Sequence, residues 1–284
     1  MKSRLKLVIA LLILQLSGCS IVAIGYNYAD AYLRYSINSY ATFNDVQKDA
    51  IKKEVGIYMA WHRNNMLAQY VIYLQELQQA GQSAAPLTQA DVARFRSEVR
   101  ALYVKTLQPA IRPAAQILSG TGPEQMEELA QSFSKENKKQ RDKELSSMPD
   151  EQLRKRAEKI IDFVENLVGN LKDEQLEKIR EMNRHLPFVS DIYINRREDN
   201  QAGLIELLKN HKAEDEIAAF LSSWLLAPEV TRTADERSIM LAFEKASDEM
   251  IVTVYQMLTE RQKKTLLKNI QKYIDTFQEL KNIA

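Results

Sequence analysis

The sequence predicts an all-α protein, a bundle of about eight or nine helices. Apolar residues recur every three or four positions along most of the chain, which is the period of one helix face; one such series is Ile239, Phe243, Ala246, Met250, Val254 and Met257. No convincing run alternates apolar and polar residues as a half-buried strand does. Of 284 residues, 8 are Gly, 7 are Pro and 1 is Cys, which excludes collagen, disordered and disulfide-stapled classes.

A recurring signal marks the helix starts. It consists of a capping or entry residue followed by Gln or an acid near the third helical position, as in FNDVQ (43–47), LTQAD (87–91), GPEQ (122–125), MPDEQ (148–152), LKDEQ (171–175) and LTERQ (258–262). In a capping box, the first side chain accepts from the third backbone N–H and the third side chain reaches back. Thr259 with Gln262 has this spacing, as have Asn44 with Gln47, Thr88 with Asp91, and Thr233 with Glu236.

The first 18 residues predict a secretory signal peptide. Three basic residues, Lys2, Arg4 and Lys6, precede an apolar run over residues 7–14. A membrane-spanning helix needs about 20 apolar residues, so this run is too short to span a bilayer.

The end of that segment resembles the bacterial lipobox, and its residues are Leu16, Ser17, Gly18 and Cys19. The resemblance implies cleavage before Cys19 and attachment of diacylglycerol to its sulfur, so that the acyl chains hold the protein on a membrane. In lipoproteins an Asp after the cysteine favours retention in the inner membrane, and this chain has Ser20 there. We therefore expect an outer-membrane lipoprotein that faces the periplasm.

We expect a signal peptide at 1–18, a lipidated, Tyr-rich entry segment at 19–42 and a helical domain at 43–284, with a subdivision near 146. In the entry segment, Tyr28, Tyr32 and Tyr35 share one face if the segment is helical. Two interpretations stay open. The tyrosines pack on the body, or they form an interfacial belt beside the lipid anchor.

The composition and motifs argue against several functions. The formal charge of +1 offers no basic footprint for nucleic acid. The 3 histidines are far apart in sequence, and no nucleophile elbow, phosphate-binding loop or dinucleotide fingerprint occurs. We therefore expect no enzyme activity, no metal and no cofactor.

Two groups of polar residues fall on otherwise apolar helix faces and form a candidate polar pocket. His62 lies among apolar positions of a helix expected from Asn44 to Gln79, with Arg63 beside it. The second group is Arg196, Arg197 and Asn200. The two interpretations are a satisfied structural network and a groove that binds a ligand.

Several segments resemble a family of bacterial lipoproteins known only as a domain of unknown function. They are the lipobox, YNYADAYLRYSINSY (26–40), AWHRNNMLAQY (60–70) and NRREDNQAGLIELL (195–208). The resemblance implies a helical fold and membrane anchoring. The Leu-Thr-x-x-Gln start LTERQ (258–262), with LKDEQ (171–175) and MPDEQ (148–152) as looser variants, is also similar to the helix starts of the periplasmic Spy and CpxP proteins, which act in envelope stress, Spy as a chaperone.

The leading functional prediction is a lipid-anchored interaction or scaffold module for an envelope protein partner. The alternatives are a chaperone or envelope-stress adaptor, as the second resemblance implies, and a hydrolase or binding protein for cell-wall fragments. The partner's identity and the oligomeric state stay open.

Overall fold

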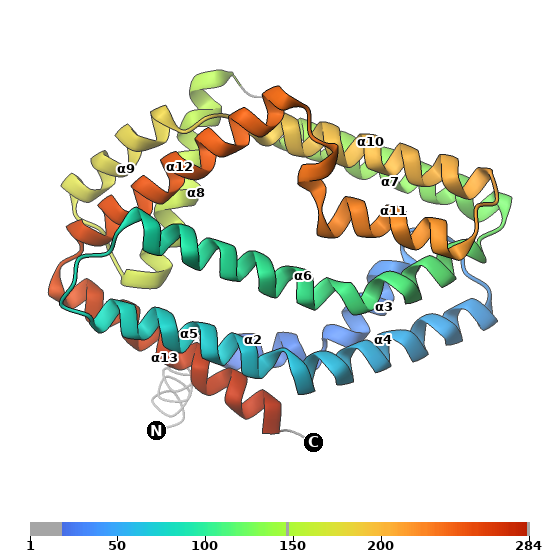
Figure 1. Cartoon of the computed structure of the whole chain (residues 1–284), viewed down its shortest axis with the longest axis horizontal. Coiled ribbons are helices and arrows are strands. Elements are labelled where there is room, and N and C mark those ends of the chain that lie inside the picture. Colours follow the sequence, from blue (N-terminus) through green and yellow to red (C-terminus); the bar gives the residue numbers. More distant parts are fainter. Residues whose placement is uncertain (1–18, 146–147, 283–284) are drawn as a thin grey trace, which may run out of the picture.

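The computed structural model describes residues 19–145 and 148–282, and every regular element in these residues is a helix (Figure 1). The all-α prediction is confirmed. The elements are α2 (Cys19–Asn27), α3 (Ala29–Asn38), α4 (Asp45–Asn65), α5 (Leu67–Gln82), α6 (Gln89–Ser119), α7 (Pro123–Glu144), α8 (Pro149–Val168), α9 (Asp173–His185), α10 (Ser190–Lys209), α11 (Glu214–Leu226), the 3-10 helix η1 (Pro228–Thr231), α12 (Ala234–Met257) and α13 (Glu260–Asn282).

The described part of the chain holds more helices than the eight or nine expected. The expectation relied on capping signals, and α3, α5 and α11 begin without a side-chain cap. The single helix expected from Asn44 to Gln79 is divided at Met66. Its N–H donates to His62 O at 2.8 Å and its carbonyl accepts from Tyr70 N at 3.0 Å, so the junction is a bend in a continuous ladder.

The long helix α6 crosses the middle of the molecule (Figure 1). It contacts α11 and α12 on one side and α4 and α5 on the other, while α13 packs closely beside α5 and α10 beside α7. The entry segment joins the same body, because α2 packs on α13 and α3 packs on α4. The subdivision expected near residue 146 falls on residues 146–147, which lie outside the described residues.

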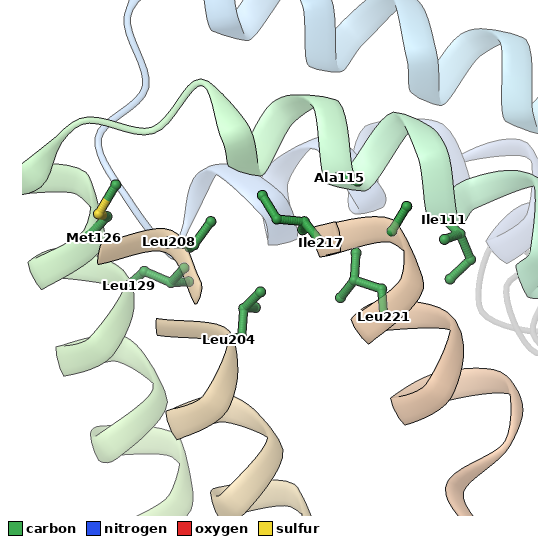
Figure 2. Packing of buried hydrophobic residues seen from close by; sticks show 9 residues of the cluster. Ile111, Ala115, Met126, Leu129, Leu204, Leu208, Ile217 and Leu221 are labelled. Carbon is green, nitrogen blue, oxygen red and sulfur yellow. The ribbon is translucent and has the colours of Figure 1, made fainter. Parts of the chain in front are cut away.

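The largest buried cluster lies where α6, α7, α10 and α11 meet (Figure 2). Each helix contributes side chains that are less than a tenth exposed, and these are Ile111, Ala115, Met126, Leu129, Leu204, Leu208, Ile217, Ala218 and Leu221. Full burial of one such Leu or Ile side chain contributes about 1.5–3 kcal/mol relative to exposure. This cluster therefore fixes one end of the molecule.

Two pairs of helix starts are joined through their capping glutamines. The amides of Gln175 and Gln262 donate to each other's carbonyl oxygen, both at 2.9 Å, and join the starts of α9 and α13. Gln47 and Gln125 make the same reciprocal pair at 3.1 and 2.7 Å between α4 and α7. Each glutamine oxygen also accepts from a backbone N–H at the start of its own helix. The capping signal thus fixes helix starts and also holds helices together.

Among the described residues, no helix combines the length and the apolar composition needed to cross a bilayer.

Candidate functional site

The residues of the candidate polar pocket lie in two separate networks. His62 and Arg63 are near the end of α4, which packs on α3, α5 and α6. Arg196, Arg197 and Asn200 are on α10, which packs on α7 and α11. Figure 1 draws the two helices on opposite sides of α6. The structure therefore does not bring the five residues into one pocket.

His62 sits in a chain of hydrogen bonds among aromatic rings. Tyr26 Oη lies 2.9 Å from its Nδ1 and Tyr70 Oη lies 3.1 Å from its Nε2. Tyr70 Oη is also 2.6 Å from Thr106 Oγ1, which donates to Leu102 O at 2.8 Å. Because the only Thr106 hydroxyl proton is used there, Tyr70 donates to Thr106 and accepts from His62 Nε2–H. Nδ1 then accepts from Tyr26, so this network is satisfied when the imidazole is neutral.

Arg63 lies beside this chain. Its guanidinium is stacked over the Tyr26 ring, with 5.5 Å from Cζ to the ring centroid. A cation at this distance is attracted by the ring face. Burial raises the pKa of Tyr26, and the hydrogen bond with Arg63 opposes that rise. The tyrosine therefore stays protonated and able to donate to His62 at neutral pH.

Acidification is expected to destabilise the protein through His62. Burial lowers the pKa of His62, so between its lowered native value and about 6.5 the unfolded chain binds more protons than the folded one. The free energy of unfolding therefore falls as pH drops through this window, by at most about 1.4 kcal/mol per pH unit for one proton. Urea unfolding at pH 5 and pH 7 measures the difference, which His62→Gln should reduce.

The matched control is His185→Gln, at an exposed position at the end of α9. It should keep the pH difference of the unchanged protein. An equal pH difference in the His62→Gln protein and the unchanged protein would contradict the role given to His62.

Arg196 ties α10 to the start of α12. Its Nε donates to both carboxylate oxygens of Glu236 at 3.0 Å, and its Nη2 lies 2.8 Å from Glu236 Oε2. The hydrogen bond lowers the pKa of Glu236 and raises that of Arg196. Asn200 Nδ2 donates to Arg196 O at 2.7 Å, and Arg197 is half-buried on the same helix. These interactions are internal to the protein.

Cys19 is the first residue of α2. The other lipobox residues, Leu16, Ser17 and Gly18, lie outside the described residues. The described residues contain no cluster of three or more His, Cys, Asp or Glu side chains able to hold a metal ion.

The strongest candidate binding site is an apolar cavity of about 450 Å³ between α5, α6, α12 and α13. Its wall consists of Tyr73, Leu77, Ala80, Gly81, Leu87, Val92, Phe95, Arg96, Val99, Ser247, Asp248, Ile251, Tyr255, Leu266, Leu267 and Ile270. Val99 and Ile251 are 47% and 51% exposed, so the cavity reaches solvent beside them. Ligand sites in proteins usually measure about 300–1,000 Å³ and are lined mainly by apolar side chains.

A glycine allows two walls of this cavity to approach each other. A Cβ on Gly81 would lie 3.0 Å from Leu267 Cδ2, closer than the usual contact between carbon atoms. The Tyr255 hydroxyl donates to Gly81 O at 3.2 Å and adds α12 to the same contact. The end of α5 is thereby held against both α12 and α13.

The charged groups on the cavity wall neutralise one another. Arg96 donates to both oxygens of Asp248, at 3.1 and 2.8 Å, and to Glu244 at 2.7 Å. The Asp248 side chain is 8% exposed, and a carboxylate so deeply buried requires such a partner. These hydrogen bonds raise the pKa of Arg96. With two carboxylates around one guanidinium, the wall offers no free positive charge to an anion, and it suits an uncharged apolar group.

Sequence reasoning missed this cavity because its walls come from residues 73–99 and 247–270. One signal was present on α12. A helix turns by 100° per residue, which places Ser247, Ile251 and Tyr255 together on one face of α12. This face points about 100° away from the apolar face that contains Phe243 and Met250. A helix that carries two such faces packs on two neighbours or borders a cavity.

A larger hollow, of about 890 Å³, lies between α7 and α10. Most of its charged side chains are paired, with Arg141 Nη2 2.5 Å from Glu198 Oε2 and Lys138 Nζ 2.8 Å from Asp142 Oδ2. Asn137 Nδ2 lies 2.6 Å from Gln201 Oε1, while Asn137 Oδ1 is buried without a partner in the described residues. Arg196, Arg197 and Asn200 do not line it. It is therefore the weaker candidate for a binding site.

The fold and the cavity define an all-α protein with an apolar cavity between four of its helices. The chain belongs to a family of unknown function (DUF6279), whose model matches residues 39–237. The match covers α4 to α11 and ends in the first turn of α12, so it includes two of the four cavity walls. No curated protein and no solved structure matches the chain. The similarity to Spy and CpxP stays a prediction.

Proposed function

We propose that this protein is a lipid-anchored binding module, or scaffold, of the bacterial outer membrane. It faces the periplasm, and its apolar cavity holds an uncharged apolar group of another envelope component. The observation that carries this proposal is the cavity, with a volume of about 450 Å³ and walls from four helices. Leu16, Ser17, Gly18 and Cys19 support the anchor.

The chemistry of the wall supports binding in preference to catalysis. The ionised side chains that line the cavity, Arg96 and Asp248, are bonded to each other. Neither is left to accept or donate a proton during a reaction. The affinity for a ligand then comes from apolar area removed from water, about 25 cal/mol per Å².

Filling the cavity is expected to abolish binding of an apolar probe. The probe is N-phenyl-1-naphthylamine, an uncharged dye whose fluorescence increases in apolar surroundings. Ser247 lines the cavity from α12, and Ser247→Phe places a ring in the space the dye occupies. A dye titration should show an affinity at least about tenfold weaker than that of the unchanged protein, a difference of about 1.4 kcal/mol.

The control is Ala242→Phe, which adds the same ring at an exposed position of α12 outside the cavity. It should bind the dye as the unchanged protein does. If both variants bind equally well, the dye does not occupy the cavity and the proposed site is wrong.

A further inference from the structure

Three tyrosines and an isoleucine form an exposed row on α2 and α3, which we name the tyrosine stripe. Ile24 is 56% exposed, Tyr28 68%, Tyr32 69% and Tyr35 73%. At 100° per residue these four side chains fall within an arc of about 80°. Isolated exposed apolar residues are ordinary, but a continuous row marks an interaction surface.

The stripe is held in a fixed direction by the opposite face of the same helices. Leu33 and Ile37 pack on the buried cluster of Ala41, Phe43, Ile51 and Val55. The backbone ladder continues through the junction of α2 and α3, with Tyr28 N to Ile24 O at 3.1 Å and Tyr32 N to Tyr28 O at 3.0 Å. The stripe therefore points away from the body along both helices.

The position of each tyrosine around the helix decides whether its side chain packs on the protein or faces outward. Tyr26 points inward and its hydroxyl bonds to His62 at 2.9 Å. Tyr40 packs on the largest buried cluster, with its ring centroid 5.7 Å from that of Phe133. Within the described residues, none of the three stripe hydroxyls has a hydrogen-bond partner in the protein. Those hydroxyls are left for water or for polar groups of a partner.

We propose that the tyrosine stripe lies in the membrane–water interface of the bilayer to which Cys19 anchors the chain. This inference depends on the anchoring in the proposed function. The stripe begins five residues after Cys19, and it extends for about 16 Å at 1.5 Å per residue. A helix lying flat beside its own anchor would bring all four side chains to the headgroup level.

Tyrosine suits this position because its ring enters an apolar layer while its hydroxyl stays hydrated. The stripe carries no charge, and the charged residues of α2 and α3, Asp30 and Arg34, are paired with each other at 3.0 Å. A neutral aromatic row matches an interfacial contact of the kind that amphipathic helices make. The contact would orient the whole body on the membrane, since α2 and α3 pack directly on α13 and α4.

Photo-crosslinking in membranes tests the inference. The full chain is produced in a bacterium with Tyr32→p-benzoylphenylalanine, and a second variant carries the same change at Tyr28. The control carries it at Tyr193, which is 53% exposed on α10. Membranes are isolated and irradiated, and phospholipid adducts are measured by mass spectrometry. The mass of the peptide that contains Cys19 is read in the same samples.

We expect phospholipid adducts at positions 28 and 32 in several-fold excess over position 193. If Cys19 is acylated while positions 28 and 32 form no more lipid adducts than position 193, the stripe does not contact the bilayer and the inference fails, although the anchor stands. Adducts with a protein at these positions also overturn it. An unmodified Cys19 overturns the anchor and the inference together. The cavity proposal is independent of this result, because the dye titration tests it separately.

Discussion

Arg156→Leu is expected to lower the free energy of unfolding by about 3–5 kcal/mol, because it removes the donor to four oxygen atoms at the end of α9 and in the turn after it. Arg156, on α8, donates from Nε to Asn183 Oδ1 at 2.7 Å and from Nη2 to the carbonyls of Asn183 and Leu186 at 2.6 and 2.8 Å. Its Nη1 donates to Pro187 O at 3.0 Å. Asn183 is in the last turn of α9, and its carbonyl otherwise accepts only a 3.3 Å bond from Leu186 N among the described residues. Leu186 and Pro187 lie in the turn after the helix, where carbonyls lack helical partners.

The leucine side chain is apolar and leaves all four acceptors without this donor. Burial lowers the pKa of Arg156, and its charge is balanced by carbonyl oxygens and by the negative end of the α9 dipole. Its guanidinium also stacks over Phe188, 4.3 Å from the ring centroid. Arg156→Lys should be intermediate, since a compact ammonium cannot reach the same acceptors as a planar fork.

Urea unfolding measures the loss, and Arg154→Leu is the control. Arg154 lies two residues earlier on α8, with its side chain 61% exposed and paired with Glu158. This exposed pair contributes little, so the control should change the free energy of unfolding by about 0.5 kcal/mol or less. Similar losses in both variants would show that Arg156 does not hold the end of α9.

The local signals of the sequence predicted the fold class and many helix starts. The capping boxes at Asn44, Thr88, Thr233 and Thr259 are all formed, because a capping box depends on only four consecutive residues. Ile239, expected on the buried face of its helix, is 40% exposed, while Met250 from the same series is buried. Periodicity identifies a face and does not show how far a neighbouring helix covers it.

The sites were less accessible to sequence reasoning, because each depends on residues distant in the chain. His62 lies on α4, and its two hydrogen-bond partners, Tyr26 and Tyr70, come from α2 and α5. Arg196 donates a hydrogen bond to Glu236, which lies 40 residues later in the chain. Helical phase grouped Tyr28, Tyr32 and Tyr35, and left open whether their face was covered. The tertiary packing of Leu33 and Ile37 decides that question.

Gln262→Ala is expected to cost about 2–4 kcal/mol, because it breaks a buried junction of two helix starts. The Gln262 amide donates to Asn170 O and to Gln175 Oε1, both at 2.9 Å, and its oxygen accepts from Thr259 N at 2.9 Å. Gln175 in turn donates to Met257 O at 2.7 Å. Both glutamines are at most 6% exposed, so water cannot replace the lost partners without opening the junction.

A double-mutant cycle with Gln175→Ala separates the pair from its surroundings. We expect the double variant to lose about 1–2 kcal/mol less free energy of unfolding than the sum of the two single variants. The reason is that the second change removes an amide that has already lost its partner through the first. Gln271→Ala is the control, because this glutamine lies on the same helix and its bond with Gln78 is exposed. Additive losses at 175 and 262 would mean that each glutamine only caps its own helix. A measurable coupling would show that the glutamine pair holds the starts of α9 and α13 together. Because α13 lines the cavity together with α5 and α12, the same pair would also stabilise the cavity wall.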